Sequence, residues 1–173
     1  MTISLYDLSV ASYLQTLGGV IGVLEKGLAH CTANNIDPNE IVETRLIGDM
    51  LPFRFQVQSV AHHSAGAIEG VKAGVFSPPP SAPDLDYRGL QKLVSDAREA
   101  LSKLTQAEVN ALEGRDVTFQ LRDFKLPFTA EGFLMSFSLP NFYFHAATTY
   151  DILRMKGVKL GKRDYMGQMR MKS

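Results

Sequence analysis

Residues 140–154 read PNFYFHAATTYDILR, a stretch that sets polar side chains inside an otherwise apolar helix. At the 3.6-residue period of an α-helix, several polar positions of this helix fall within about 80° of arc, between aromatic and aliphatic flanks. These positions, called the polar file, are Ser138, Asn141, His145 and Thr149. A buried polar group costs free energy unless it is hydrogen-bonded or liganded. The chain must therefore supply partners for the polar file or bind a molecule that does.

The helix that carries the polar file is the last long helix expected in the chain. It should begin near Thr129, a suitable N-terminal cap, and end at Lys156, with Gly157 as its stop. Pro140 lies inside this helix. It should kink the helix about one turn before His145, because proline has no backbone N–H and its ring clashes with the preceding turn.

Three earlier segments carry the same helical periodicity of apolar residues. They cover about residues 8–33, 54–72 and 90–104, and Asp86 is the expected cap of the third. Together with the last helix, these segments supply four long amphipathic helices, each with one face to bury.

A shorter helix is expected over residues 37–49. Asp37 is suited to the N-cap, Pro38 to the first helical position and Glu40 to a capping box. Pro52 would end this helix, since proline cannot continue it.

Other segments are not helical. Residues 77–83 contain four prolines in seven residues, which remove backbone donors and fix an extended loop. Residues 117–121 and 126–128 alternate like the strands of a small β-hairpin, with a polar turn between them. The expected fold is therefore all-α: a four-helix bundle with a short extra helix and a small β-hairpin before the last helix.

The length of 173 residues fits a single domain, residues 1–173, with a basic C-terminal tail from about residue 157. Gly157 and Gly161 should let this tail turn back onto the bundle. The chain has 18 acidic and 18 basic residues, so it has no overall charge that would attract nucleic acid or an anionic membrane. We expect neither as a partner.

The single cysteine, Cys31, excludes an intrachain disulfide and any multi-cysteine zinc site. The N-terminus lacks the basic region and the cleavage site of a signal peptide. Its apolar run from Val20 to Leu24 stops at Glu25, short of a membrane span. The simplest expectation is a soluble protein of the reducing cytoplasm.

Several segments resemble a known family. They are RLIGDM at 45–50, QVQ at 56–58, the stretch at 140–154, and GVKLGKRDYMG at 157–167. Together they are similar to the uncharacterised bacterial and fungal family nineteen ninety-three among the domains of unknown function, within the DinB/YfiT-like superfamily of metalloenzyme-like proteins. The resemblance spans nearly the whole chain. It implies a four-helix bundle that is often dimeric.

The resemblance also implies a divalent metal, held by one histidine of the second helix and a His-x-x-x-His pair of the last helix. His145 stands at the first position of that pair, but Thr149 stands at the second. His62 and His63 are the candidates for the second-helix histidine, and His63 is the better one because it borders the apolar stripe. The triad is therefore incomplete, and one interpretation is zinc or nickel bound by His145 and His63, with a nearby carboxylate such as Asp49 as a further ligand.

A second interpretation is a pocket between helices that holds a small ligand by hydrogen bonds. Asp49 is a nearby carboxylate four residues after Arg45, a spacing that gives either a surface ion pair or polar groups over the mouth of the bundle. A third interpretation makes His145 an interior histidine whose partners all belong to the protein. The candidate ligand-binding residues are His145, Asn141, Thr149, His63, Gln56 and Asp49.

Three functions follow from these interpretations. The first is a soluble bundle protein that binds a small ligand without catalysis. The second is a divalent-metal-dependent enzyme that resembles thiol transferases, with an incomplete histidine triad. The third is a non-catalytic dimeric protein with a structural or stress-associated role. A homodimer is expected because aromatic residues cluster around Pro140.

Overall fold

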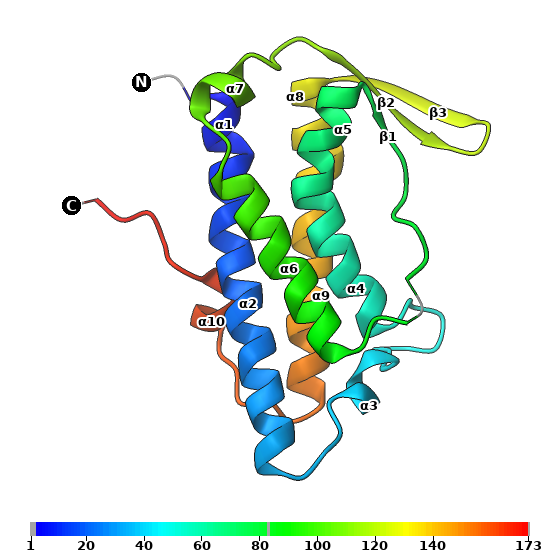
Figure 1. Cartoon of the computed structure of the whole chain (residues 1–173), viewed down its shortest axis with the longest axis vertical. Helices are drawn as coiled ribbons and strands as arrows, with labels where there is room; N and C mark the ends of the chain where they lie inside the picture. The colour runs from blue at the N-terminus through cyan, green and yellow to red at the C-terminus, as the bar shows by residue number, and fades with distance from the viewer. Residues whose placement is uncertain (1–2, 83, 173) are drawn as a thin grey trace.

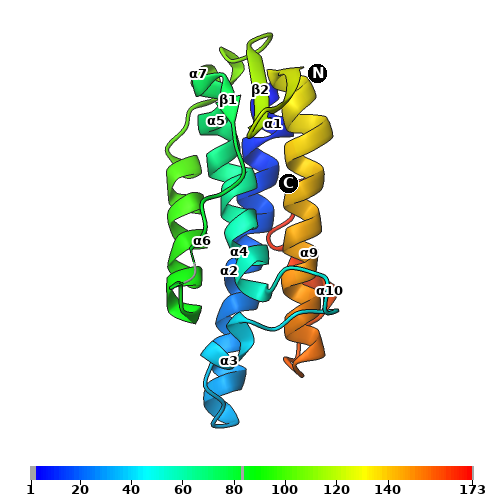
Figure 2. The same ribbon diagram turned by 90° about the vertical axis from the view of Figure 1, so that its right-hand side faces the viewer.

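Four helical columns form the body of the protein in a computed structural model that describes residues 3–82 and 84–172 (Figure 1). The columns are, in chain order, α2 (Val10–Ala33); α4 (Phe53–Ala61), η1 (His62–Gly66) and α5 (Ala67–Ala73); α6 (Tyr87–Ser102); and α8 (Ala130–Phe133), η2 (Leu134–Ser138) and α9 (Leu139–Met155). Both α2 and α4 pack against α6 and α9, so the columns enclose a common apolar core (Figure 2). Four short helices complete the helical part of the described chain: α1 (Leu5–Leu8), α3 (Asn39–Val42), α7 (Gln106–Asn110) and α10 (Lys162–Met166).

A small sheet lies at one end of the columns (Figure 1). Its strands, in spatial order, are β1 (Val75–Phe76), β2 (Asp116–Leu121) and β3 (Phe124–Thr129). Strands β2 and β3 are antiparallel, with Leu121 opposite Phe124, and they lie where the hairpin was expected. Strand β1 pairs with β2 in parallel and was not expected, because two residues are too few to show an alternating pattern.

Polar side chains cap two of the columns as predicted. Asp86 Oδ1 accepts a hydrogen bond of 2.7 Å from the Gly89 amide, and Thr129 Oγ1 accepts one of 3.2 Å from the Gly132 amide. Gly157, with φ of +90°, follows the last column in a conformation that favours glycine. These caps confirm the expected start of the third column and both ends of the fourth. The proline-rich segment is a loop over residues 77–82, and Pro83 lies outside the described residues.

The short helix expected over residues 37–49 is wrong in length, because α3 ends at Val42 and the chain continues as turns and bends. Arg45 Nη1 donates to the Met50 carbonyl oxygen at 2.5 Å, inside this exposed loop. Arg45 and Asp49 therefore do not share a helical face. Gly48 is a poor helix former, which helps the loop compete with a continued helix.

The last column changes from a π-helix to an α-helix just before Pro140. Residues Leu134–Ser138 form the π-helix η2, and Pro140 lies at the start of α9 directly after it. A proline cannot donate to the preceding turn and clashes with its carbonyl, and a wider turn relieves that conflict. The expected disturbance is thus present, but it is a π-helical segment before Pro140.

The C-terminal tail returns to the bundle as expected, and it packs against α2. Lys26 Nζ lies 2.7 Å from Asp164 Oδ1 and joins α2 to α10. Gly19 of α2 lies beneath α10, where an added Cβ would clash with the Tyr165 carbonyl oxygen. Gly22, one turn further along α2, has no atom within 4 Å of such a Cβ.

We expect Gly19→Ala to lower the free energy of unfolding by about 1–3 kcal/mol, because the new methyl group must displace α10. Gly22→Ala is the matched control and should raise the free energy of unfolding by roughly 0.5–1 kcal/mol, since alanine favours an open helical position. Urea unfolding of both variants measures the difference. Equal stabilisation by the two substitutions would show that α10 does not pack on Gly19.

Residues Leu5–Ala33 are long and apolar enough to cross a membrane by length and composition alone, with a hydropathy of 1.2. This segment is longer than the apolar run from Val20 to Leu24, from which no membrane span was expected. In the structure, 50% of the most apolar window is buried inside the protein. Buried residues such as Leu17 and Leu24 belong to the common core, and the core helices of soluble proteins pass the same test of length and composition.

Candidate functional site

His145 on α9 faces Gln56 on α4, and a hydrogen bond of 2.7 Å joins His145 Nδ1 to Gln56 Oε1. The Gln56 amide nitrogen donates to the Leu51 carbonyl oxygen at 2.8 Å, so Oε1 is the accepting atom of the amide. His145 Nδ1 therefore carries the hydrogen, which leaves a lone pair on Nε2 of the neutral ring. The His145 side chain is half-buried.

His63, from η1, lies beside His145. The centroids of the two imidazole rings are 5.9 Å apart and their planes differ by 18°. His63 is only 7% exposed. Within residues 3–82 and 84–172, its Nδ1 is the one buried side-chain polar atom that has no hydrogen-bond partner. Such atoms are rare in folded proteins and require an explanation.

Both imidazoles are neutral near pH 7. Burial, together with smaller effects of charge on His145 and His62, lowers the pKa of His63 to about 3. Burial also lowers the pKa of His145 to about 4. Each neutral ring offers one N–H group and one lone pair. The pair can therefore accept hydrogen bonds without adding charge to the site.

Aromatic rings pack against both imidazoles and reduce their contact with water. Phe76 and Phe137 pack against His63, with centroid distances of 5.3 and 5.8 Å. Phe55 and Phe144 pack against His145, at 5.8 and 5.2 Å. These rings are the physical cause of the burial that lowers both pKa values.

Two π-helical segments meet directly beside the imidazole pair. Ser138 Oγ in η2 donates to the His63 carbonyl oxygen in η1 at 2.7 Å. With its hydrogen used in this way, Ser138 Oγ accepts from the Tyr13 hydroxyl at 2.8 Å. Wide turns of this kind inside helices occur often at functional sites. One hydrogen bond thus joins the second and fourth columns where their helices widen, and a second joins Ser138 to the first column.

The other predicted site residues do not converge on His145 Nε2. Asn141 Nδ2 donates to the Phe137 carbonyl oxygen at 2.7 Å, within its own column. Thr149 Oγ1 donates to the His145 carbonyl oxygen at 2.9 Å, also within that column. Asp49 is exposed in the loop after α3. The predicted residues that the structure brings together are His145, Gln56 and His63.

Sequence reasoning missed Tyr13 and Phe55 as neighbours of the site. Tyr13 lies three residues after Val10 and four before Leu17, so helical spacing indicates its burial but does not name its partner. Phe55 directly precedes Gln56, and nothing in its spacing distinguishes it from an ordinary surface aromatic residue.

The residues around His145 do not fit the three-ligand metal centre that the resemblance implied. Thr149 occupies the place of the second histidine and gives its hydroxyl hydrogen to its own helix. His62 points to the proline-rich loop instead, with Nε2 2.7 Å from the Ser77 carbonyl oxygen. Across the described part of the chain, no group of three or more His, Cys, Asp or Glu side chains could hold a metal ion. His63 and His145 alone fall short of the ligand count of a zinc site.

The predicted pocket beside His145 is not one of the main cavities. His145, His63 and Gln56 are not among the residues that line five cavities found in the described part of the chain. Phe144, which packs against His145, is 54% exposed.

The four columns and the small sheet form a fold that is also found in a DinB family member. A crystal structure of a DinB family member protein from Shewanella denitrificans matches the chain with a TM-score of 0.80 and 23% sequence identity. The match covers 98% of this chain and 95% of that chain. The chain belongs to the family described as Domain of unknown function (DUF1993), whose family model matches residues 5–166. No curated protein matches the sequence.

Proposed function

We propose that this protein binds a small hydrogen-bond donor between α4 and α9, at the neutral imidazoles of His63 and His145. The observation that supports the proposal is the buried Nδ1 of His63, which has no partner within the described residues. A buried polar atom without a partner costs about 1–3 kcal/mol. In the tautomer of His63 that carries its hydrogen on Nε2, a ligand that donates a hydrogen bond to Nδ1 recovers that free energy.

The chemistry of the pair indicates the class of ligand. Gln56 holds His145 in the tautomer whose Nε2 accepts a hydrogen bond. Because both rings are neutral, they offer no positive charge to a carboxylate or a phosphate. The nearby rings of Phe55 and Phe144 favour a flat apolar body. The ligand is therefore a neutral aromatic molecule with a hydroxyl or similar donor, and phenol is its simplest representative.

Binding has more support than catalysis. A general base works best when its pKa lies near the working pH, whereas the pKa values of His63 and His145 are about 3 and 4. A metal-dependent, thiol transferase-like reaction would need a further ligand beside these two histidines. A purely structural role leaves the unpartnered nitrogen of His63 unexplained.

We also propose that the protein forms a homodimer and is located in the cytoplasm. Met135, Tyr143 and Phe144 are 50%, 40% and 54% exposed, so the last column carries apolar side chains on its surface on either side of Pro140. Exposed apolar residues that gather in one region often belong to an interface. Both expectations stay predictions.

We expect phenol to bind with one molecule per chain, and toluene to bind about 10-fold more weakly because it lacks one hydrogen-bond donor. Isothermal titration calorimetry at pH 7 measures both affinities. His63→Leu should remove the preference for phenol. His30→Leu, which changes a histidine at the far end of α2, should leave it unchanged. Equal affinity for phenol and toluene in the unmodified protein would contradict the proposal.

A further inference from the structure

A separate cavity of about 410 Å³ lies on the other side of the second column, between that column, α6 and the proline-rich loop. We call residues 77–82 of this loop the strap. The cavity lies within the size range of small-molecule sites, roughly 300–1,000 Å³. Its walls are mainly carbon, and the residues that line it include Ala61, Ala65, Pro79, Leu85, Leu93 and Ala97.

Three side chains of the second column hold the strap in place. His62 Nε2 donates to the Ser77 carbonyl oxygen at 2.7 Å, and Gln58 Nε2 donates to the Pro80 carbonyl oxygen at 2.5 Å. Arg54 Nη1 donates to the Ala82 carbonyl oxygen at 3.1 Å. The donors are four residues apart, one per helical turn, so they form a single row along the helix.

This row gives the cavity a fixed outer wall. The prolines of the strap have no backbone N–H, so the strap presents carbonyl oxygens that need donors. Gln58 and His62 both line the cavity, yet each uses a side-chain donor on the strap. One nitrogen of each side chain is therefore engaged with the strap, and mainly apolar surface faces the space between the strap and the helices.

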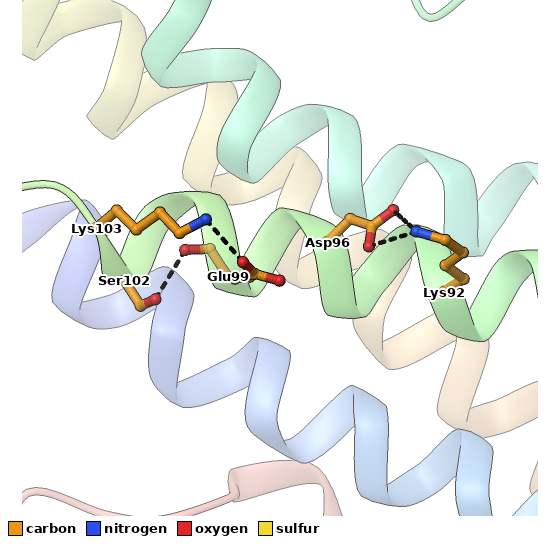
Figure 3. Close-up of polar contacts among 5 residues, drawn as sticks. All are labelled: Lys92, Asp96, Glu99, Ser102 and Lys103. Atoms are coloured by element: carbon orange, nitrogen blue, oxygen red, sulfur yellow. Dashed lines mark hydrogen bonds and ion pairs between the residues drawn. The ribbon is translucent and has the colours of Figure 1, made fainter.

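The charge at the rim is also compensated. Asp96 of α6 is the one carboxylate that lines the cavity within the described residues. Lys92 Nζ lies 2.8 and 2.6 Å from its two carboxylate oxygens (Figure 3). A charged ligand would find no unmatched partner on these walls, and burying its charge there would be unfavourable.

We propose that this cavity binds an uncharged, largely apolar molecule of two or three rings, held between α6 and the second column under the strap. The cavity volume sets the size of this molecule, and the carbon-rich walls favour an apolar one. The hydrogen bonds to the strap and the Lys92–Asp96 ion pair disfavour a charged one. The site is distinct from the imidazole pair, because His62 faces the strap whereas the neighbouring His63 faces α9.

Two fluorescent probes with the same skeleton test this proposal. N-phenyl-1-naphthylamine is uncharged, and 8-anilinonaphthalene-1-sulfonate carries a sulfonate. We expect the uncharged probe to bind saturably with one molecule per chain and a rise in fluorescence. The sulfonate should bind at least 10-fold more weakly. Absence of saturable binding by the uncharged probe, or tighter binding of the sulfonate, would overturn the proposal.

Matched variants locate the binding. Ala97→Phe fills the cavity and should weaken binding of the uncharged probe at least 10-fold. Ala100→Phe places the same side chain on the exposed face of α6 and should leave the affinity unchanged. Thermal unfolding verifies that each variant is folded, and Ala65→Leu replaces Ala97→Phe if the latter does not fold. His63→Leu should leave the affinity unchanged. Binding that persists in the filled variant, or that is lost only with His63→Leu, would refute this site.

Discussion

Leucine at position 63 should stabilise the protein, whereas leucine at position 145 should destabilise it. His63→Leu removes a buried nitrogen that has no partner within the described residues and keeps a similar side-chain volume. We expect the free energy of unfolding to rise by about 1–3 kcal/mol. His145→Leu instead leaves Gln56 Oε1 without its donor, although Gln56 is only 2% exposed. We expect a fall of about 1–3 kcal/mol.

Chemical denaturation at pH 7 measures both values, with His30→Leu as the control for replacing a histidine outside the site. The opposite signs of the two changes in unfolding free energy distinguish the residues. The His145 side chain has a hydrogen-bond partner in Gln56, whereas His63 Nδ1 has none within the described residues. A gain of stability combined with a loss of phenol binding is the pattern of a residue retained for function at a cost in stability. Loss of stability in both leucine variants would show that His63 Nδ1 has a partner in solution.

The second large effect is expected at Ser138, which joins three columns. Its hydroxyl donates to the His63 carbonyl oxygen and accepts from the Tyr13 hydroxyl. Ser138→Ala removes both of these buried hydrogen bonds, so the free energy of unfolding should fall by about 2–4 kcal/mol. Tyr13→Phe should cost less, about 1 kcal/mol, because Ser138 still donates to His63.

A double-mutant cycle with urea unfolding measures this coupling. Once Tyr13 is phenylalanine, Ser138→Ala removes only the hydrogen bond to the His63 carbonyl oxygen. The double variant should therefore be more stable than the sum of the single effects predicts. Strictly additive effects would show that the Tyr13 and Ser138 hydroxyls are not bonded to each other. The same result would remove the proposed link between the first column and the two π-helical segments.

The long helices could be predicted from the sequence because burial repeats along them with the helical period. Caps such as Asp86 and Thr129 could be predicted because their side chains accept hydrogen bonds from backbone amides three residues later in the sequence. The π-helical segments could not, since they depend on contacts between columns, such as the bond from Ser138 to His63. The early end of α3 was missed because the N-terminal signals of a helix do not fix its length.

The candidate site was predicted in part. His145 and Gln56 lie on the faces that meet when α4 and α9 pack, so helical spacing was enough to bring them together. Asn141 and Thr149 were expected to face a ligand, but both side chains bond to carbonyl oxygens four residues earlier. Asparagine and threonine compete in this way for local backbone groups, and a periodicity argument does not take this into account.

Nitrogen NMR of the imidazole rings tests the central claim most directly. In the free protein, His63 and His145 should both stay neutral as the pH falls from 7 to about 5, because burial lowers their pKa values to about 3 and 4. Phenol added at pH 7 should then shift His63 Nδ1 or His145 Nε2 as the acceptor of its single hydroxyl hydrogen, and toluene should shift neither. The claim is contradicted if His63 titrates near its ordinary pKa of about 6.5, or if phenol shifts neither nitrogen.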